Sequence, residues 1–436
     1  MTLRAAVEWS HQLLSEPERI LFRRLSVFAG AFDLQAPERV AAGEQVDELE
    51  VLDLLTQLVN KSLLVTSEDA EGMVRYRLLE TLRQYAAERL QESDEEVAAH
   101  DRHLAYFLDM AEHAFAERIE AETAWVARLE QDHDDLRAAL DWALGRRPAD
   151  ALRLAGALGW FWYLHGHLSE GRTHLAAALE GRREAGPDLA RALWSGGTLA
   201  GWQGDVEAAR PLLEESRRMY EAWGDRLGIA MCLDSMGWAL IIAGDAHGAL
   251  SNWEEALGIQ RELGDARGIE LARVAVCQGL VAVKDVESAE PMAAEILAVG
   301  QESRDARSTH FGYHFLADCA LMRADVAAAE RLYGDSLRAA LVYDDAVDVT
   351  FEVEGVAMSA AGMGDARPAL RLGGAVEARR EELGMYMSIS FWNEFQELWF
   401  GVAREALGPE ASAAAWSEGR AMGWDAAVRE ALERKG

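Results

Sequence analysis

Apolar and polar positions follow a helical period over nearly the whole chain, and in its second half the pattern repeats at a fixed interval. Stretches of about 16 residues, each apolar on one side, alternate with short polar turns. An aspartate occupies one turn in every 40 residues, in the dipeptides Gly204-Asp205, Gly244-Asp245, Lys284-Asp285, Ala324-Asp325 and Gly364-Asp365. A second set of turns keeps the same interval, in Gly224-Asp225, Gly264-Asp265, Arg304-Asp305 and Asp344-Asp345. This period, with two helices per unit, predicts helical repeats of the tetratricopeptide (TPR) type.

The residues around each turn indicate why one unit folds and why several must stack. An aspartate side chain accepts hydrogen bonds from the free N–H groups at the start of a helix, and a small residue before it suits a tight turn. One helix pair leaves an apolar face in water, whereas stacked pairs cover that face. Small residues allow the helices to approach closely, at Gly197, Gly237, Cys277, Ala317 and Ala357. We therefore expect five TPR-like repeats over residues 186–384, followed by capping helices over residues 385–436.

The beginning of the chain predicts a different unit. Short helices are expected up to residue 60, and Ser15 and Pro17 provide the N-cap and first turn of the second one. Residues 62–66 and 74–78 alternate well enough to predict a β-hairpin. Helices followed by a hairpin are typical of a winged helix, which we expect over residues 1–92.

Residues 93–185 predict a helical linker and a divergent first repeat that turns at Gly166. The predicted fold class is therefore all-α, with an N-terminal winged helix that carries a small β-hairpin. A TPR-like α-α superhelix with repeats of about 40 residues follows it.

Composition and charge restrict the partners. The chain has 75 acidic and 43 basic residues, a net charge of −32, which opposes binding to polyanions such as nucleic acid or an anionic membrane. The sequence shows neither a signal segment nor an apolar run of about 18 residues. The three cysteines lack the spacing of a metal site and fit a reducing compartment. We expect a soluble, cytoplasmic protein without a membrane partner.

The charges of the winged helix also argue against DNA. The segment from Phe32 to Gly43, expected to enter a groove, has Arg39 as its one basic residue, and the wing carries Glu68, Asp69 and Glu71. A DNA-binding surface needs basic side chains at these places. Nucleic acid is therefore not the expected partner, and a DNA-binding regulator that acts through the winged helix is the alternative.

The concave side of such an array is lined by the first helix of each repeat and commonly binds a partner. Counting from the column of small residues predicts which side chains point into this groove. They are Arg191, Trp194, Thr198, Trp202, Asp234, Trp238, Gln278, His314, Asp318 and Glu354. Aromatic and polar residues suit a binding surface for a protein, a peptide or a small inducer. The alternative for some inward positions, above all those with Met or Phe, is packing between repeats.

The sequence predicts no enzymatic chemistry and no cofactor. The P-loop pattern G-x-x-x-x-G-K-[ST] is missing, and the spacing of residues indicates neither a Ser–His–Asp nor a Cys–His site. His310 and His314 share a helix face, but the Glu of an H-E-x-x-H site is absent. His165, His167 and His174 are close in sequence, and turn or surface roles suit them better than metal binding. We therefore expect no metal site.

Several segments resemble the winged-helix region of bacterial STAND-type regulators, which carry an NB-ARC-like NTPase and include LuxR-type, AfsR-like and MalT-like proteins. They are LRAAVEWSHQLLSEPERILFRRLSVFAGAF, LLTQLVNKSLL, YRLLETLRQYAAERL, AWVARLEQDHDDLRAALDWAL and, near the end, AAAWSEGRAMGWDAAVREAL. In that family the NTPase precedes this region, and in LuxR-type members a DNA-binding helix-turn-helix follows it. Leu79-Glu80 stands where the family often has a nucleotide-sensing His beside an acidic residue.

The resemblance implies a non-enzymatic sensor or scaffold module of a signalling or transcription regulator. In this hypothesis the groove binds its ligand and the winged helix couples that event to an NB-ARC-type NTPase, in cis or in trans. Neither the NTPase nor the terminal helix-turn-helix is expected within these 436 residues.

Overall fold

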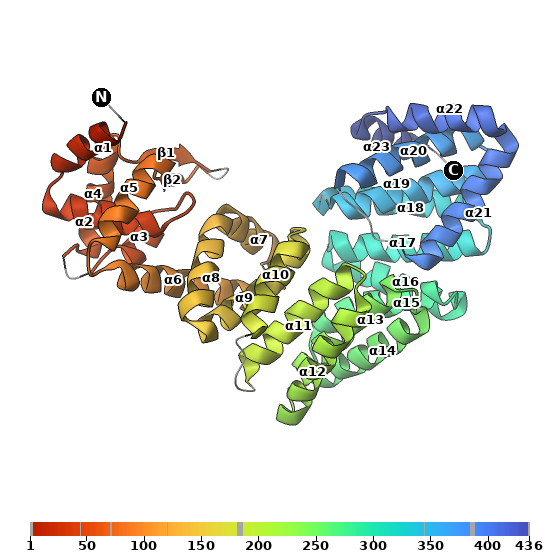
Figure 1. Ribbon diagram of the computed structural model, residues 1–436. Coiled ribbons are helices and arrows are strands. Elements are labelled where there is room, and N and C mark those ends of the chain that lie inside the picture. Colours follow the sequence, from red (N-terminus) through yellow and green to blue (C-terminus); the bar gives the residue numbers. More distant parts are fainter. Residues whose placement is uncertain are drawn as a thin grey trace. The chain divides into compact units, whose positions relative to one another are not determined.

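The computed structural model describes residues 3–43, 45–69, 72–119, 121–180, 186–343, 345–383 and 389–434. The chain divides into two compact units, Met1–Leu199 and Ala200–Gly436, and each is treated by itself (Figure 1). The described residues are helical apart from one two-stranded antiparallel sheet, so the predicted all-α class is confirmed. Among these residues, none of the helices combines the length and the apolar character that crossing a bilayer requires.

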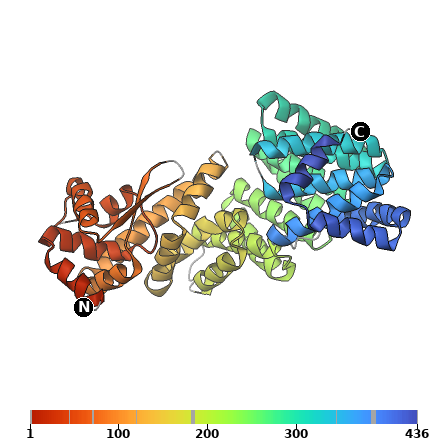
Figure 2. The same cartoon turned by 90° about the horizontal axis from the view of Figure 1, so that it is seen from above.

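The first unit begins with the elements of a winged helix, drawn from above in red to orange in Figure 2. Ser15 precedes the second helix, where its N–H donates to Glu18 Oε2 at 2.6 Å, and Pro17 lies in the first turn. The elements are α1 (Leu3–Gln12), α2 (Glu16–Arg24), η1 (Leu25–Val27), α3 (Gln35–Val40), η2 (Glu48–Glu50), α4 (Val51–Asn60), β1 (Val65–Glu68), β2 (Val74–Arg77) and α5 (Glu80–Gln91). The first strand starts later than the expected residue 62, because Ser62 adopts a left-handed turn with φ of 58° after α4.

The hairpin is held from both sides. Its register pairs Val65 with Arg77 and Glu68 with Val74, and Phe32 adds a bridge to Tyr76. Between the two strands, Ala70 and Glu71 lie outside the described residues. On the other side, buried Arg75 forms an ion pair with buried Asp132 at 2.5 Å.

Longer helices complete the first unit. They are α6 (Glu96–Ala116), α7 (Glu122–Gln131), α8 (His133–Arg146), α9 (Pro148–Leu164), α10 (Leu168–Glu180) and α11 (Pro187–Trp202), whose last residues belong to the second unit. Asp135 at the start of α8 accepts a hydrogen bond from Ala29 N at 2.7 Å and contacts His103 at 3.1 Å. The acidic run around His133 therefore joins α8 to the winged helix. Gly166, with φ of 79°, forms the turn between α9 and α10, as expected.

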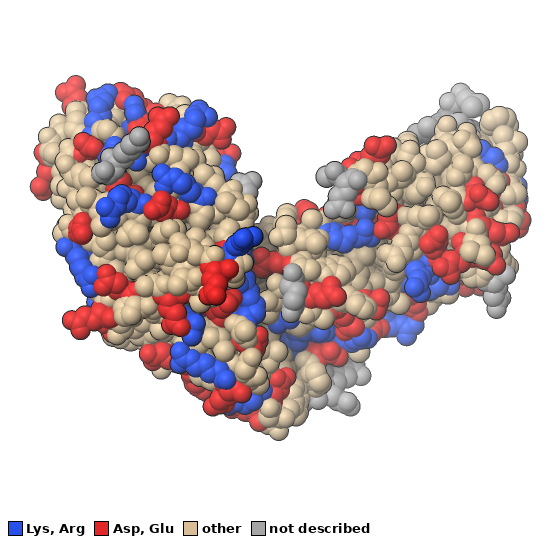
Figure 3. Space-filling model, turned by 180° about the vertical axis from the view of Figure 1, so that it is seen from behind, with Lys and Arg blue, Asp and Glu red and all other residues tan. Residues whose placement is uncertain are grey.

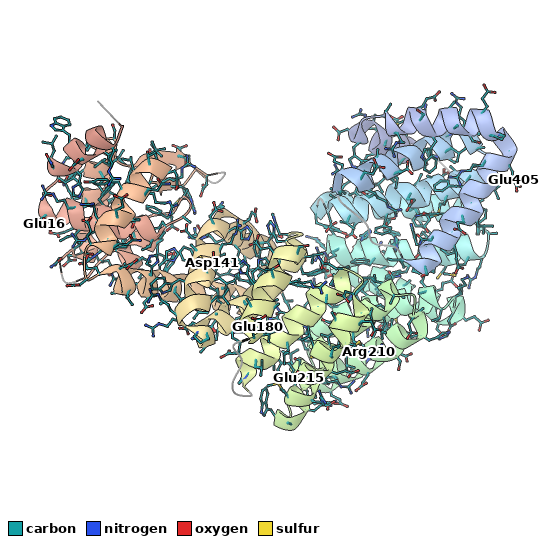
Figure 4. The ribbon with its side chains drawn as sticks, viewed as in Figure 1. Glu16, Asp141, Glu180, Arg210, Glu215 and Glu405 are labelled. Atoms are coloured by element: carbon teal, nitrogen blue, oxygen red, sulfur yellow. The ribbon has the colours of Figure 1, made fainter. Side chains whose placement is uncertain are left out.

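Paired antiparallel helices build the second unit. They are α12 (Val206–Trp223), α13 (Arg226–Ile242), α14 (Ala246–Leu263), α15 (Ala266–Ala282), α16 (Val286–Ser303), α17 (Ala306–Met322), α18 (Val326–Tyr343), α19 (Ala346–Gly362) and α20 (Ala366–Leu383). The second helix of a pair carries charged side chains toward solvent, such as Arg210 on α12, which is labelled in Figure 4 with Glu215 of the same helix.

The repeated aspartates cap these helices as the sequence predicts. Asp205, Asp245 and Asp285 accept hydrogen bonds from the third residue after them at 2.9–3.1 Å. The residue before each has a positive φ, which is 76° at Gly204 and 62° at Lys284. A left-handed conformation is easy for glycine and strained for other residues, which explains the preference for glycine in these turns.

Neighbouring helices approach closely at glycine positions. A Cβ atom on Gly237 of α13 would lie 2.3 Å from Nε1 of Trp253, which is fully buried on α14. A similar close contact joins successive pairs, where a Cβ on Gly355 of α19 would lie 2.5 Å from the ring of Tyr333 on α18. Large aromatic residues of the second helices thus pack against glycines of the first helices.

The C-terminal helices lie against the last pairs of the array in both views (Figures 1 and 2). They are α21 (Ser390–Leu407), α22 (Pro409–Arg420) and α23 (Trp424–Glu433). A Cβ on Gly419 of α22 would lie 1.8 Å from the backbone oxygen of Arg371 on α20, so the two helices touch through their backbones. After α23, Arg434 pairs with Glu330 at 2.5 Å and with Asp365 at 2.6 Å.

Two glycine substitutions test this packing. We expect Gly237→Ala to lower the free energy of unfolding by about 1–3 kcal/mol, because the added methyl group must displace Trp253. Gly258 on α14 is the matched control, since a Cβ there meets no atom within 4 Å. Gly258→Ala should raise the free energy of unfolding by about 0.5–1 kcal/mol through helix propensity. Urea unfolding followed by circular dichroism measures both, and shifts of the same sign would contradict the packing described.

Candidate functional site

The residues that we expected to line one groove lie in several different places. Three of them, Arg191, Trp194 and Thr198, lie in the first unit. Trp194 is 8% exposed and packs edge-on against Phe115 of α6, with ring centroids 6.0 Å apart. Arg191 contacts Glu112 of α6 at 3.4 Å, and Thr198 donates to the backbone oxygen of Trp194 at 2.8 Å. We expected these side chains to face an open groove. The structure instead packs Arg191 and Trp194 against α6, because this part of α11 uses its inner face to cover an earlier helix.

The second unit brings three of the expected residues together. The rings of Trp202 and Trp238 stack with centroids 5.1 Å apart and planes 27° apart. Trp253 supports Trp238 from the interior at 5.1 Å in an edge-to-face contact, and its Nε1 donates to the backbone oxygen of Asp234 at 3.2 Å. Trp202, Asp234 and Trp238 all remain partly exposed. A rigid pair of indole rings with a carboxylate beside it is therefore available to a ligand.

Asp234 is electrostatically unusual. Burial raises the pKa of Asp234 to about 7, and an interaction of its carboxyl group with the Trp253 side chain offsets only part of that rise. A carboxyl group with such a pKa exchanges its proton near neutral pH. It can therefore donate or accept a hydrogen bond at this surface.

Gln278 on α15 is largely buried. It is 9% exposed, and its Nε2 has no hydrogen-bond partner among the residues that the structure describes. The amide is therefore a donor at the inner side of α15, at a position that the repeat interval aligns with Trp238.

His314 and Asp318 belong to a buried polar cluster. His314 Nδ1 lies 2.7 Å from Glu352 Oε1, and its Nε2 lies 3.5 Å from Asp318 Oδ2. Tyr333 donates to Asp318 Oδ1 at 2.5 Å. Asp318 and Glu352 are fully buried and His314 is 8% exposed, so these side chains contact one another rather than an open groove.

The charges within this cluster depend on one another. Burial alone lowers the pKa of His314, but Asp318 and Glu352 outweigh it and raise that pKa to about 9. Burial raises the pKa of Asp318 to about 6. Burial also favours a neutral Glu352, yet contacts with His314 and His310 prevail and lower the pKa of Glu352 to about 2. At neutral pH the interior of α17 and α19 thus holds an imidazolium beside a carboxylate.

Glu354 is covered by α21. Its carboxylate accepts from Trp392 Nε1 at 2.5 Å, Gln396 Nε2 at 3.0 Å and Arg380 Nη2 at 2.7 Å, and it is 3% exposed. Trp392 also stacks on His314 with centroids 5.5 Å apart. We expected Glu354 to line a groove, whereas α21 of the same chain occupies this part of the inner face.

Sequence reasoning missed residues that hold these groups in place, namely Trp253, Tyr333, Glu352 and Trp392. A signal existed for Glu352, because the equivalent positions one and two repeats earlier are Gly312 and Ala272. A glutamate in a column of small, buried residues must find polar partners. For Trp392 no such signal existed, since α21 departs from the repeat.

The surface of the winged helix is poor in basic groups. The helix directly before the hairpin is α4, and its sequence VLDLLTQLVN holds neither Lys nor Arg. Lys61, just after it, forms an ion pair with Glu18 at 2.5 Å. Arg75 of the wing is buried and forms an ion pair with Asp132. On the face drawn in Figure 3, basic side chains are interspersed with acidic ones.

The cysteines are not candidates for nucleophilic chemistry. Cys232, Cys277 and Cys319 are free and buried. Burial raises the pKa of Cys232 and of Cys319 to about 12, so both thiols stay protonated at neutral pH.

Comparisons with known proteins agree with this architecture. Residues 14–91 match the winged helix-turn-helix domain family. A Mycobacterium bovis protein, provisionally named an HTH-type transcriptional regulator, is 45% identical over 183 residues, which are 42% of this chain and 20% of that protein. An uncharacterized M. bovis protein is 48% identical over 95 residues, 22% of this chain and 24% of its own length. The chain thus spans about a fifth to a quarter of the length of these relatives.

Two solved structures resemble the chain in fold. One is a Signal Transduction ATPase with Numerous Domains (STAND) protein with a tetratricopeptide repeat sensor from Pyrococcus horikoshii, with a TM-score of 0.50 and 14% identity, over 99% of this chain and 67% of that one. The other is a Rap protein complexed with Competence and Sporulation Factor, with a TM-score of 0.52 and 13% identity, over 75% of this chain and 95% of that one. At these identities the likeness shows the fold alone. The predicted winged helix followed by a TPR-like superhelix is confirmed.

The raised pKa of Asp234 predicts how stability depends on pH. Its folded-state pKa of about 7 lies above the ~3.9 of an unfolded aspartate, so the folded state loses stability as the pH rises from about 4 through 7. We expect Asp234→Asn to raise the free energy of unfolding by roughly 1–3 kcal/mol at pH 8, because one pKa unit corresponds to about 1.4 kcal/mol and water screens part of the charge. Near pH 4 the gain should be close to zero.

Thermal unfolding of both proteins at pH 4, 6 and 8 measures this difference. Asp335→Asn is the control, since Asp335 lies at the surface and pairs with Arg338 at 2.8 Å. The control should shift stability by less than about 1 kcal/mol at every pH. A gain for Asp234→Asn that is equal at pH 4 and pH 8 would contradict a raised pKa.

Proposed function

We propose that this chain is the non-enzymatic sensor module of a STAND-type regulator and that its helical array binds a segment of a partner protein or a peptide. The binding face is the surface of Trp202, Asp234 and Trp238. Binding is coupled through the winged helix to an NB-ARC-type NTPase, in cis or in trans. The resemblance of the sequence to that family and the fold shared with a STAND protein that has a TPR sensor support this assignment.

The observation that carries the proposal is the way the array binds its own helix α21. There an indole of the helix stacks on a side chain of the array, and Nε1 of Trp392 donates to the carboxylate of Glu354. Trp202, Asp234 and Trp238 offer the same kinds of group, two aromatic rings and a carboxyl group, on a face that is partly exposed. The inner face is therefore suited to a helical or extended segment that carries an aromatic residue and a donor.

The winged helix acts in this proposal as a coupling element. Several of its basic groups are engaged within the chain, as in the pairs of Lys61 with Glu18 and of Arg75 with Asp132. The second pair and the contact of Asp135 with Ala29 join the winged helix to α7 and α8. A displacement of α8 is thereby transmitted to the hairpin through hydrogen-bonded contacts.

A peptide-binding experiment tests the binding face. A library of random peptides displayed on phage is selected against the full chain, and enriched peptides are synthesised and titrated while tryptophan fluorescence is followed. We expect Trp202→Ala combined with Trp238→Ala to weaken binding at least tenfold, because stacked aromatic anchors commonly contribute 2 kcal/mol or more, ~30-fold. Trp223→Ala is the matched control, since Trp223 is 45% exposed at the end of α12.

Loss of binding in the control to the same degree as in the double variant would remove the two residues from the site. Failure of every selection against the full chain would count against a peptide ligand. Circular dichroism of the variants shows whether the array is folded.

The alternative is a DNA-binding regulator, which the winged-helix family match and the names of the curated relatives favour. A mobility-shift assay at low salt with random duplex DNA distinguishes the two. We expect no shift at micromolar protein, because α4 lacks basic residues and the net charge is −32. A shift that weakens steeply with salt and is lost on Arg77→Ala, an exposed position of β2, would establish the alternative instead.

A further inference from the structure

Two imidazoles and a carboxylate converge in the interior of the array. His310 and His314 are one helical turn apart on α17, and Glu352 comes from α19 of the next repeat. His310 Nε2 lies 2.9 Å and His314 Nδ1 lies 2.7 Å from the same atom, Glu352 Oε1. The three ligand atoms all lie within 4.8 Å of one another, and the residues are 2%, 8% and 0% exposed.

The outward nitrogen of each imidazole lies near a further polar group. His310 Nδ1 lies 2.9 Å from the hydroxyl of Tyr343, which donates to Asp348 at 2.7 Å. His314 Nε2 faces Asp318 Oδ2 at 3.5 Å. Histidines that bind a metal are typically oriented in this way, through the ring nitrogen that does not contact the ion. The arrangement directs Nε2 of His310 and Nδ1 of His314 toward one point.

The cluster contains the acidic side chains of Glu352, Asp318 and Asp348 beside two imidazoles. No Lys or Arg of the described chain forms an ion pair with these three acids, so the two histidines are their only basic partners there. Glu352 Oε2 and Asp318 Oδ2 are buried without a hydrogen-bond partner. Buried oxygens of this kind are costly unless a proton or a cation satisfies them.

We propose that His310, His314 and Glu352 bind a divalent transition-metal ion of the zinc class as a structural centre. Two imidazole nitrogens and one carboxylate oxygen form an established ligand set for Zn²⁺, with bonds of about 2.0–2.2 Å. Binding of the ion displaces to solvent any proton on the ring nitrogens that face Glu352. Each neutral ring then keeps its other N–H for Tyr343 or Asp318. The remaining coordination position is open to Glu352 Oε2 or to water.

The ion would join successive repeats beneath α21. α17 supplies two ligands and α19 the third, and Trp392 of α21 stacks on His314. This cluster lies in a different region of the array from the proposed peptide-binding surface, and the inference does not depend on that surface. Sequence reasoning excluded a metal here because no glutamate stands within the His310–His314 turn, whereas the structure supplies it from 38 residues beyond His314.

A second histidine cluster provides the control. Glu130, His165 and His167 also place ligand atoms within 4.8 Å of one another, but His165 is 38% and His167 is 28% exposed at the side chain. Exposed histidines commonly take up Zn²⁺ weakly. His165→Asn with His167→Asn therefore removes adventitious binding and leaves the buried cluster intact.

Metal analysis of the full chain tests the proposal. The protein, freed of any affinity tag, is stripped with a chelator, reloaded with Zn²⁺ or Co²⁺ and dialysed, and the metal is measured by plasma mass spectrometry. We expect one equivalent in the wild type and in the control double variant. Glu352→Gln should weaken binding at least ~10–100-fold, the range that losing only an outer-shell partner of a metal ligand costs. His310→Asn with His314→Asn should abolish it.

X-ray absorption of the Zn²⁺-loaded wild type tests the proposed ligands directly, even where a variant does not fold. The spectrum should contain imidazole scattering from two ligands and remain unchanged in the control double variant. Less than a tenth of an equivalent in the wild type would overturn the proposal. So would metal that disappears with His165→Asn and His167→Asn while Glu352→Gln retains it.

Discussion

The hydrogen bond between an aspartate carboxylate and the first turn of a helix sets the geometry of the array. It recurs at Asp205, Asp245 and Asp285, each time after a residue with positive φ. The cap fixes where each helix starts, so helices of successive repeats present equivalent positions to their neighbours. Because the start is fixed, the phase of every helix is fixed as well. Trp253 and Tyr333, which are 80 residues apart, accordingly occupy equivalent positions on α14 and α18, and each packs against a glycine of a neighbouring helix, Gly237 or Gly355.

The inner face of the array has two regions that differ in their side chains. Around α13 the positions carry stacked indoles that remain partly exposed, supported by Trp253. Around α17 and α19 the equivalent positions carry histidine and acidic residues, which are buried and contact one another. Helix α21 adds to the burial of the second region, where Trp392 stacks on His314. One scaffold therefore presents a surface for recognition in one part and an interior polar cluster in another.

Local features of the fold were predictable because they depend on neighbours in the sequence. The repeat interval, the aspartate caps, the glycine turns and the hairpin all fall into this group. The surroundings of single side chains were harder to predict. Trp194 is buried by Phe115, which is 79 residues away, and His314 meets a glutamate of the following repeat. Periodicity predicts which face a residue occupies, but not whether another segment covers that face. Of the groove residues expected in the second unit, Trp202, Asp234 and Trp238 are the ones that remain partly exposed.

The contacts of α21 affect how the array unfolds. In a simple solenoid each repeat contacts its immediate neighbours, and the ends fray independently. Here Ser390 lies beside Gly244, Glu394 pairs with Lys284 at 2.5 Å and Trp392 bonds Glu354, so one helix touches three separate repeats. Such long-range contacts link the stabilities of repeats that do not adjoin. The segment from α13 to α20 should therefore exchange its most protected amide hydrogens in a single cooperative opening, rather than in a gradient from its ends.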